Sequence, residues 1–211
     1  MSIRVDPALY FSAHRSAFGR LSQEQVDGLN ALLAGMADDE PLTDIRHAAY
    51  MLATAWLETA MTMQPIAERG RVAYFNRYDP VLADTQARRR RARTMGNVNQ
   101  GDGYRYRGRG YVQLTWQANY RKAGLVVGVD LVAEPDRAME PAIAYRIMSE
   151  GMRAGWFTGA RLTDYIRATR CDYINARRII NGTDKAAEIA GYARLFEGCL
   201  RAAEKKTEKT T

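Results

Sequence analysis

The segment of residues 46–70 constrains the fold more than any other part of the chain. Within it, residues 48–57 are all apolar or small apart from one threonine. Alanine, leucine and methionine favour helices, Thr43 or Asp44 can cap the start, and Pro65 is expected to end the run. A helix that is apolar nearly all round must be buried, so the sequence predicts the central helix of a globular core.

Two carboxylates follow this helical run. Glu58 stands at its end, and Glu68 comes ten positions later, past the expected stop. Burial disfavours the charged form of a carboxyl group, and a carboxyl that stays partly protonated near neutrality suits general-acid chemistry. One carboxyl on a buried helix and a second on a nearby loop is an arrangement that glycosidases use. We therefore predict that Glu58 and Glu68 are a catalytic pair.

The composition indicates a globular protein with an anionic partner. The chain has 211 residues, of which 46% are hydrophobic and 26% charged, enough for one domain with a substantial core. Its net charge of +7 is compatible with nucleic acid, a membrane surface or a bacterial envelope. No stretch has the length of a membrane span, and residues 1–18 lack the apolar segment of a secretory signal, so synthesis in the cytoplasm is expected.

Residues 88–110 are dense in Gly, Asn, Asp and Arg, and we expect an extended, mobile and basic segment over a cleft. Its arginine run consists of Arg88, Arg89, Arg90, Arg91 and Arg93. Three interpretations stay open: a solvated helical face, contact with anionic envelope polymers such as outer-membrane lipid, and nucleic-acid binding. No segment matches a base-reading module, so no specific nucleic-acid partner is expected.

The cysteines and histidines indicate no metal or redox chemistry. Cys171 and Cys199 are compatible with reduced thiols or with a disulfide, and the absence of a secretory signal favours the reduced form. His14 and His47 lack the spacing of metal ligands. No metal and no cofactor are expected.

Residues 111–120 offer the surface that sugars bind. An alternating, β-branched and aromatic pattern predicts a short strand over residues 111–115, followed by a helical turn. Sugars are held by hydrogen bonds to their hydroxyls and amides, and by aromatic rings against their C–H faces. The polar candidates are Gln113, Thr115 and Asn119, and the aromatic candidates are Tyr111, Trp116 and Tyr120. A core strand with a polar edge is the alternative.

The remaining segments predict scaffold helices. They are two helices over residues 6–36 with a Ser22–Gln25 capping box, one over 141–159, one capped by Thr163 and Asp164 with a helical region ending at Asn181, and one over 186–206.

Several of these segments resemble glycoside hydrolase family 19, the plant-type chitinases and related phage endolysins. GDGYRYRGRGYVQLTWQANY (101–120) resembles the family's substrate-cleft signature, and ATAWLETAMTMQPIAERG (53–70) resembles the catalytic-helix segment of its phage and bacterial members. Residues 130–157 and 174–184 are similar to the following helix and to the Ile-Asn-Gly region. The resemblance spans roughly residues 46–200, in family order.

The resemblance implies roles for individual residues. Glu58 matches the general acid, Glu68 the base that activates water, and Thr115 the hydroxyl that helps to hold this water. Gln113, Asn119 and Tyr120 match residues that bind sugar N-acetyl and hydroxyl groups, and Asn181 matches an asparagine lining the same groove. The family inverts the anomeric carbon, which requires about 6.5–9.5 Å between the carboxylates.

The sequence departs from the family pattern at Leu57, where a histidine is usual, at Ala60 and Met61, where two smaller residues are usual, and at Glu188. At this last position, chitinases have the arginine that pairs with the base. We therefore expect electrostatic support for Glu68 from Arg69, Arg71 or Arg109, and we include Arg109 among the substrate-binding residues.

The expected fold is all-α (mainly α) and lysozyme-like. It has a large helical lobe over residues 1–74 and 116–205 and a small, irregular or short-stranded lobe over 75–115, in a single catalytic domain without a separate wall-binding domain. The expected protein is a monomeric, antimicrobial phage-type endolysin that hydrolyses β-1,4 bonds of peptidoglycan and lyses the host cell. It would be made in the host cytoplasm and act on the periplasmic cell wall after release. The alternatives are a chitinase acting on β-1,4 N-acetylglucosamine polymers and a non-catalytic glycan-binding module.

Overall fold

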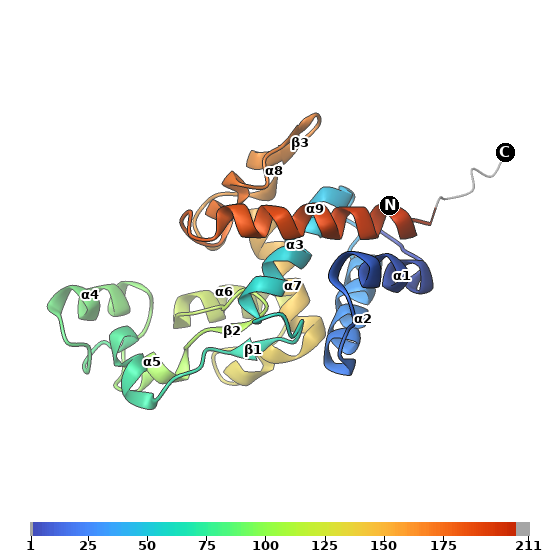
Figure 1. Cartoon of the computed structure of the whole chain (residues 1–211). Helices are drawn as coiled ribbons and strands as arrows, with labels where there is room; N and C mark the ends of the chain where they lie inside the picture. Colours follow the sequence, from blue (N-terminus) through green and yellow to red (C-terminus); the bar gives the residue numbers. More distant parts are fainter. Residues whose placement is uncertain (1, 206–211) are drawn as a thin grey trace. The chain divides into compact units, whose positions relative to one another are not determined.

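The computed structural model describes residues 2–205 and is mainly helical (Figure 1), which confirms the predicted fold class. The chain forms two compact units: unit 1 comprises residues 2–64 and 148–205, and unit 2 comprises Pro65–Ile147. Unit 2 is larger than the small lobe predicted over residues 75–115, because it also holds the strand before this segment and the helices after it. None of the helices within residues 2–205 has the length and apolar character needed to cross a bilayer.

Unit 1 contains α1 (Pro7–Phe18), α2 (Gln23–Asp38), α3 (Ile45–Glu58), α8 (Leu162–Tyr165), β3 (Ile166–Arg167), β4 (Arg170–Cys171), η3 (Asn175–Ile179) and α9 (Ala186–Ala203). Unit 2 contains β1 (Ile66–Ala67), η1 (Val72–Tyr78), α4 (Gln86–Thr94), α5 (Asp102–Arg105), β2 (Arg109–Gly110), α6 (Gln117–Val127) and η2 (Pro135–Met139). Helix α7 (Pro141–Ala154) begins in unit 2 and ends in unit 1.

The core of unit 1 is built around α3, as the sequence predicts. Every residue of this helix from His47 to Trp56 is buried, and α3 packs along α9, which in turn packs along α1. Asp44 caps α3 by accepting a hydrogen bond from the N–H of Arg46. The capping box of Ser22 and Gln25 on α2 is also present. Burial of a continuous apolar surface, rather than intrinsic helix propensity alone, therefore holds α3 in place.

Helix α3 ends at Glu58, so the prediction that Pro65 stops it is wrong. The helix stops earlier because the buried Thr59 hydroxyl donates to the carbonyl of Ala55 and accepts from the N–H of Met63, which closes a tight turn. Ala60, Met61 and Met63 adopt positive φ angles in this turn. Such conformations are costly for residues with a side chain, so the turn that follows Glu58 is held under local strain.

The segment between α7 and α9 differs from the predicted helices. The N-cap of α8 is Arg161 rather than Thr163 or Asp164, and a β3–β4 hairpin follows directly. Only the 3₁₀ turn η3 forms in the region predicted to be helical up to Asn181. Helix α9 starts where predicted and ends at Ala203, because Glu204 leaves the helix to form a β-bridge with Val5. Lys206, the last residue of the predicted helix, lies outside the described residues.

Unit 2 is organised around Asp79, which is buried. Its carboxylate accepts hydrogen bonds from the N–H groups of Val81, Leu82, Gly101 and Gly103. Burial opposes the charged form, but these four donors outweigh it and hold the pKa of Asp79 below its usual value. A single carboxylate thus ties η1 to the start of α5.

The strand predicted over residues 111–115 forms instead at residues 109–110. β2 pairs antiparallel with β1, with Ile66 opposite Gly110 and Ala67 opposite Arg109. Residues 111–113 make a turn, after which Leu114 bridges back to Arg109. Gly110 and Gln113 have positive φ angles, which reverse the chain too sharply for a longer strand.

The arginine run forms a regular helix, so the prediction of an extended segment is wrong here. Thr85 caps α4, and Ala92 is the residue of this helix that is buried. The other side chains, including the arginines, are exposed. The arginine run therefore lies on an exposed helical face, and its binding partner stays a prediction.

Candidate functional site

Glu58 is held by an arginine that the sequence did not single out. The Arg177 guanidinium donates to Oε1 of Glu58 over 2.6 Å, and its Nε donates to the carbonyl of Asp184 over 3.0 Å. The Glu58 side chain is 20% exposed and that of Arg177 is 4% exposed. No residue between 2 and 205 donates a hydrogen bond to the second oxygen, Oε2. Arg177 therefore fixes the orientation of the carboxyl group and leaves one oxygen available for chemistry.

The fold explains how Arg177 reaches Glu58. Glu58 is the last residue of α3, and η3 brings Arg177 to it from 119 positions along the chain. The neighbouring Arg178 points to solvent, and Glu188, on the first turn of α9, is exposed. The adjacent Arg177 and Arg178 were the feature of the sequence from which a charged partner for Glu58 could have been predicted. Tertiary packing decides which of the two faces inward.

Glu68 is held by neutral donors. It follows β1 directly, and its N–H donates to the carbonyl of Gly108 over 2.8 Å. The Tyr78 hydroxyl donates to its Oε1 over 3.1 Å, and the N–H of Gly108 donates to its Oε2 over 3.3 Å. Burial, followed by the neighbouring Glu68 carboxylate, raises the pKa of Tyr78 to about 12, so this hydroxyl stays protonated as a donor.

No arginine pairs with Glu68 among the described residues, so the expected support from Arg69, Arg71 or Arg109 is wrong. Arg109 is buried, and its Nε and Nη1 nitrogens donate to other groups of unit 2. It donates to Asp136 over 2.8 Å, to the Tyr120 hydroxyl over 2.8 Å and to the carbonyl of Arg105 over 2.8 Å. A buried guanidinium held in this way positions β2 rather than contacting a ligand.

The polar residues after β2 lie close to the loop that holds Glu68. Gln113 donates to the carbonyl of Ile66 over 3.2 Å, and a side chain at Gly108 would meet Gln113 at 2.6 Å. The Thr115 hydroxyl donates to the carbonyl of Gln113 over 2.8 Å, and Asn119 donates to the carbonyl of Thr115 over 2.8 Å. Gln113, Thr115 and Asn119 are partly exposed, so each retains surface for a ligand.

The three aromatic candidates have different surroundings. Tyr111 is fully buried, and so is Tyr120, which donates to the carbonyl of Arg107 over 2.7 Å. Trp116 is 9% exposed and lines an open pocket with Tyr78 and Thr115. Of the three, Trp116 has a face available to a sugar, whereas the other two support the segment from within.

Asn181 belongs to unit 1 and is exposed, at the end of η3. Its Oδ1 accepts a hydrogen bond from the N–H of Gly182 over 2.9 Å, which leaves its amide N–H₂ group to solvent. Its predicted place in the groove stays a prediction.

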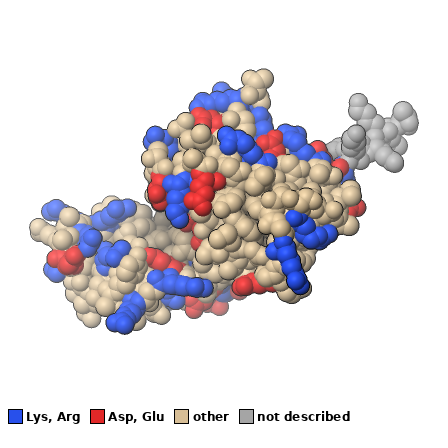
Figure 2. Space-filling model, in the orientation of Figure 1, with Lys and Arg blue, Asp and Glu red and all other residues tan. Residues whose placement is uncertain are grey.

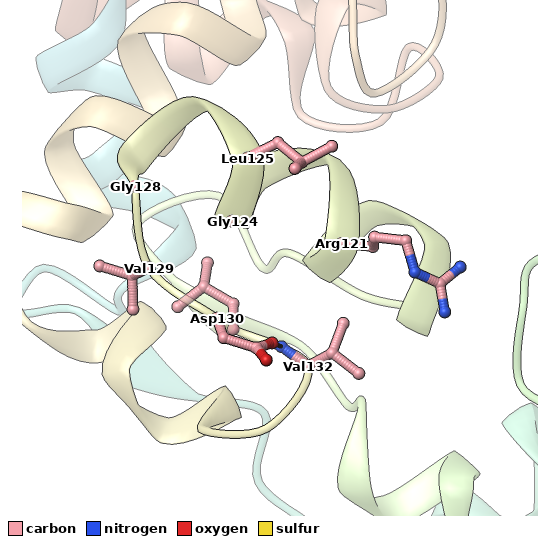
Figure 3. Close-up of a pocket in the computed structure, with 8 residues that line it drawn as sticks. Arg121, Gly124, Leu125, Gly128, Val129, Asp130 and Val132 are labelled. Carbon is pink, nitrogen blue, oxygen red and sulfur yellow. Dashed lines mark hydrogen bonds between the residues drawn. The ribbon is translucent and has the colours of Figure 1, made fainter.

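A larger cavity of about 540 Å³ lies elsewhere in unit 2, between α6 and the loop that follows it (Figure 3). Its lining includes the apolar residues Leu125, Val129 and Val132 and the charged residues Arg121 and Asp130 (Figure 3). None of the predicted site residues lines this cavity.

The described part of the chain holds neither a cluster of metal-binding side chains nor a disulfide. Residues 2–205 contain no group of three or more His, Cys, Asp and Glu side chains able to hold a metal ion. Cys171 is exposed, Cys199 is buried, and both are free thiols.

Comparison with known proteins finds a family match over part of the chain. Residues 82–159 match the family of class I chitinases, glycoside hydrolase family 19. Endochitinase 1 of Theobroma cacao is 47% identical over 45 residues, which are 21% of this chain and 14% of that protein. An acidic endochitinase of Solanum chilense is 50% identical over 52 residues, 23% of this chain and 20% of that protein. The matched segments thus span a fifth or less of these relatives.

Solved structures extend the likeness in fold to nearly the whole chain. Chitinase C from Streptomyces griseus has a TM-score of 0.62 at 20% identity, covering 96% of this chain and 79% of that one. A bacterial family 19 chitinase has a TM-score of 0.52 at 21% identity, covering 92% and 94% of the two chains. The fold is that of the chitinase-like glycoside hydrolases. Within this fold, residues 82–159 are the segment that matches the family model of glycoside hydrolase family 19.

Proposed function

We propose that the protein is an endolysin that hydrolyses the β-1,4 glycosidic bonds of bacterial peptidoglycan. The observation that carries a glycosidase function is that two carboxyl groups have different hydrogen-bond donors. Glu58 accepts from the buried guanidinium of Arg177, and Glu68 accepts from neutral donors. Two carboxyl groups in unlike surroundings are suited to unlike roles. The family resemblance assigns the acid role to Glu58 and the base role to Glu68. The family match supports the same chemistry.

In this proposal Glu58 is the general acid. Its Oε1 is fixed by Arg177, so Oε2 carries the proton and delivers it to the bridging oxygen as the bond to the anomeric carbon breaks. The leaving sugar departs as a neutral alcohol.

Glu68 is the base in the same step. It takes a proton from a water molecule whose oxygen attacks the anomeric carbon from the opposite face, which inverts the configuration. The Thr115 hydroxyl donates a hydrogen bond to the carbonyl of Gln113. Its oxygen can therefore accept a hydrogen bond from this water. Gln113, Asn119 and Trp116 are the proposed sugar contacts, and Tyr111, Tyr120 and Arg109 hold them in position.

A chitinase is the second candidate, and the named relatives favour it because both are endochitinases. The two functions share the mechanism and the bond type, and differ in whether the substrate carries acidic groups. The net charge of +7 favours the acidic polymer, peptidoglycan.

The experiment is turbidity loss of outer-membrane-permeabilised Gram-negative cells, with chitin hexamer hydrolysis measured in parallel. We expect the wild type to lyse cells. In both Glu58→Gln and Glu68→Gln the rate of turbidity loss should fall at least about 100-fold. Hydrolysis of chitin without lysis would replace the endolysin by the chitinase. Equal lysis by all three proteins would show that the carboxylates are structural and that the basic surface damages the cells.

Two further sequence predictions belong with this function. Synthesis in a host cytoplasm followed by action on the periplasmic wall is part of the proposal, as is the monomeric state. Contact of the exposed α4 arginines with anionic outer-membrane lipid stays a prediction, and sedimentation with vesicles containing anionic lipid tests it.

A further inference from the structure

An arginine-lined pocket lies beside Glu68 in unit 2. Its volume is about 340 Å³, and it is lined by Arg77, Tyr78, Arg88, Arg91, Thr115 and Trp116. Arg77 comes from η1, and two of the α4 arginines supply the other charges. In Figure 2, Lys and Arg side chains gather around the part of unit 2 where Figure 1 places α4. The pocket is therefore strongly basic.

Two of the three guanidinium groups are not neutralised within residues 2–205. Arg88 is paired with Asp84 through two hydrogen bonds of 2.8 Å. Arg77 lies 3.7 Å from the ring centroid of Tyr74 and uses its Nε on the carbonyl of that residue, so its terminal nitrogens have no acceptor there. Arg91 lies 5.7 Å from the ring centroid of Trp116 and has no acceptor.

No acidic side chain lines the pocket. A guanidinium group presents N–H donors in a fixed fork that matches a carboxylate, and an aromatic face beside it restricts its motion. Arg77 and Arg91 are thus held in place by rings while their charges remain available. This arrangement suits a carboxylate ligand better than an uncharged sugar.

Tyr78 connects this pocket to the proposed base. One face of Tyr78 lines the pocket, and its hydroxyl donates to Glu68 over 3.1 Å. Thr115 also lines the pocket. A glycan bound at Glu68 would therefore carry its substituents next to Arg77 and Arg91.

We propose that this pocket is a carboxylate subsite that binds the acidic peptide substituent of the peptidoglycan strand, an inference that rests on the proposed function. Chitin has no carboxylate, so the pocket makes the enzyme discriminate between the two polymers. Specificity arises because an uncharged glycan leaves the two guanidinium groups without a partner.

The test compares two soluble substrates that have the same sugars. One is a peptidoglycan strand with its stem peptides intact, and the other is this strand after its carboxylates have been converted to amides. We expect wild-type kcat/KM to fall about 10-fold on amidation. In Arg77→Gln and in Arg91→Gln, kcat/KM on the acidic strand should fall about 10-fold, because a charge-assisted contact is lost. On the amidated strand, kcat/KM of each variant should fall less than twofold.

Arg90→Gln is the matched control, because Arg90 lies on the same helix, is exposed and does not line the pocket. This substitution removes the same charge and should leave kcat/KM on both substrates within twofold of the wild-type values. Equal losses for Arg90→Gln and Arg91→Gln would overturn the subsite in favour of a general charge effect. Insensitivity of the wild type to amidation would also overturn it.

A binding measurement separates this inference from the proposed function. Glu58→Gln, which keeps the pocket, is titrated calorimetrically with a disaccharide that carries an acidic stem peptide, and with its amidated form. The subsite is supported if Glu58→Gln binds the acidic form more tightly than the amidated form and Glu58→Gln/Arg91→Gln does not. This result supports the subsite even if the wild type cleaves neither strand. Equal affinities for both forms refute the subsite even if the wild type is an active endolysin.

Discussion

His14 makes the stability of unit 1 depend on pH. It lies on α1, is fully buried among aromatic rings, and stacks on Phe18 with ring centroids 4.3 Å apart. Neither ring nitrogen has a hydrogen-bond partner within residues 2–205. Burial lowers the pKa of His14 from its ordinary value of 6.5 to about 4. The folded protein therefore holds this imidazole neutral at a pH where the unfolded chain protonates it.

The sign of the effect follows from this difference. Between pH 6.5 and 4 the unfolded state binds the extra proton, so the free energy of unfolding falls as the pH is lowered. For a pKa of 4 in the folded state and 6.5 in the unfolded state, the loss between pH 7.5 and 5 is about 2 kcal/mol. In a domain of this size, each kcal/mol lowers the melting temperature by about 2–4 °C, so a drop of about 4–8 °C is expected.

His14→Phe isolates the contribution of this side chain. Phenylalanine keeps an aromatic ring between Phe18 and the neighbouring Phe196 but does not titrate. The melting temperatures of both proteins, measured by circular dichroism at pH 7.5 and 5, should differ in their pH dependence by about 4–8 °C. The same decrease in both proteins would refute the reasoning, because the pH effect would then come from other groups.

Three further outcomes are expected. Arg177→Gln should lower glycan hydrolysis about 10- to 100-fold because Glu58 loses its charged partner, while Arg178→Gln, at the exposed neighbour, should leave initial rates unchanged. Tyr78→Phe should lower kcat about 10-fold with an unchanged melting temperature, and an unchanged kcat would show that its hydroxyl does not support the base. Asp79→Asn should destabilise unit 2 by about 2–3 kcal/mol in urea denaturation at pH 7. This difference should shrink as the pH falls below about 4, because protonation of the wild-type carboxyl removes the same charge.

Much of the helical scaffold could be predicted from local sequence. The capping box of Ser22 and Gln25, the buried helix α3 and the long helix α9 are read from caps and from periodicity, which act over a few residues. Two of the errors lie where chain reversals decide the structure. The turn after Glu58 and the shift of the predicted 111–115 strand to Arg109–Gly110 depend on positive φ angles that no residue pattern announced.

The sequence by itself determined which residues are available for chemistry. Glu58 after an apolar helix, Glu68 ten positions later and the family resemblance all follow from residue type and spacing. Local sequence has this power because apolar periodicity, helix caps and residue type act over a few residues of the chain.

Only the tertiary structure decided the partners of these residues. Arg177 reaches Glu58 across 119 positions, and Gly108 reaches Glu68 across 40, whereas the sequence had suggested nearby arginines for Glu68. Burial selects such partners, because a carboxyl removed from water must be satisfied by whichever donors the packed chain brings to it. The donors of Glu58 and Glu68 were therefore fixed by packing across the chain, beyond the reach of local sequence patterns.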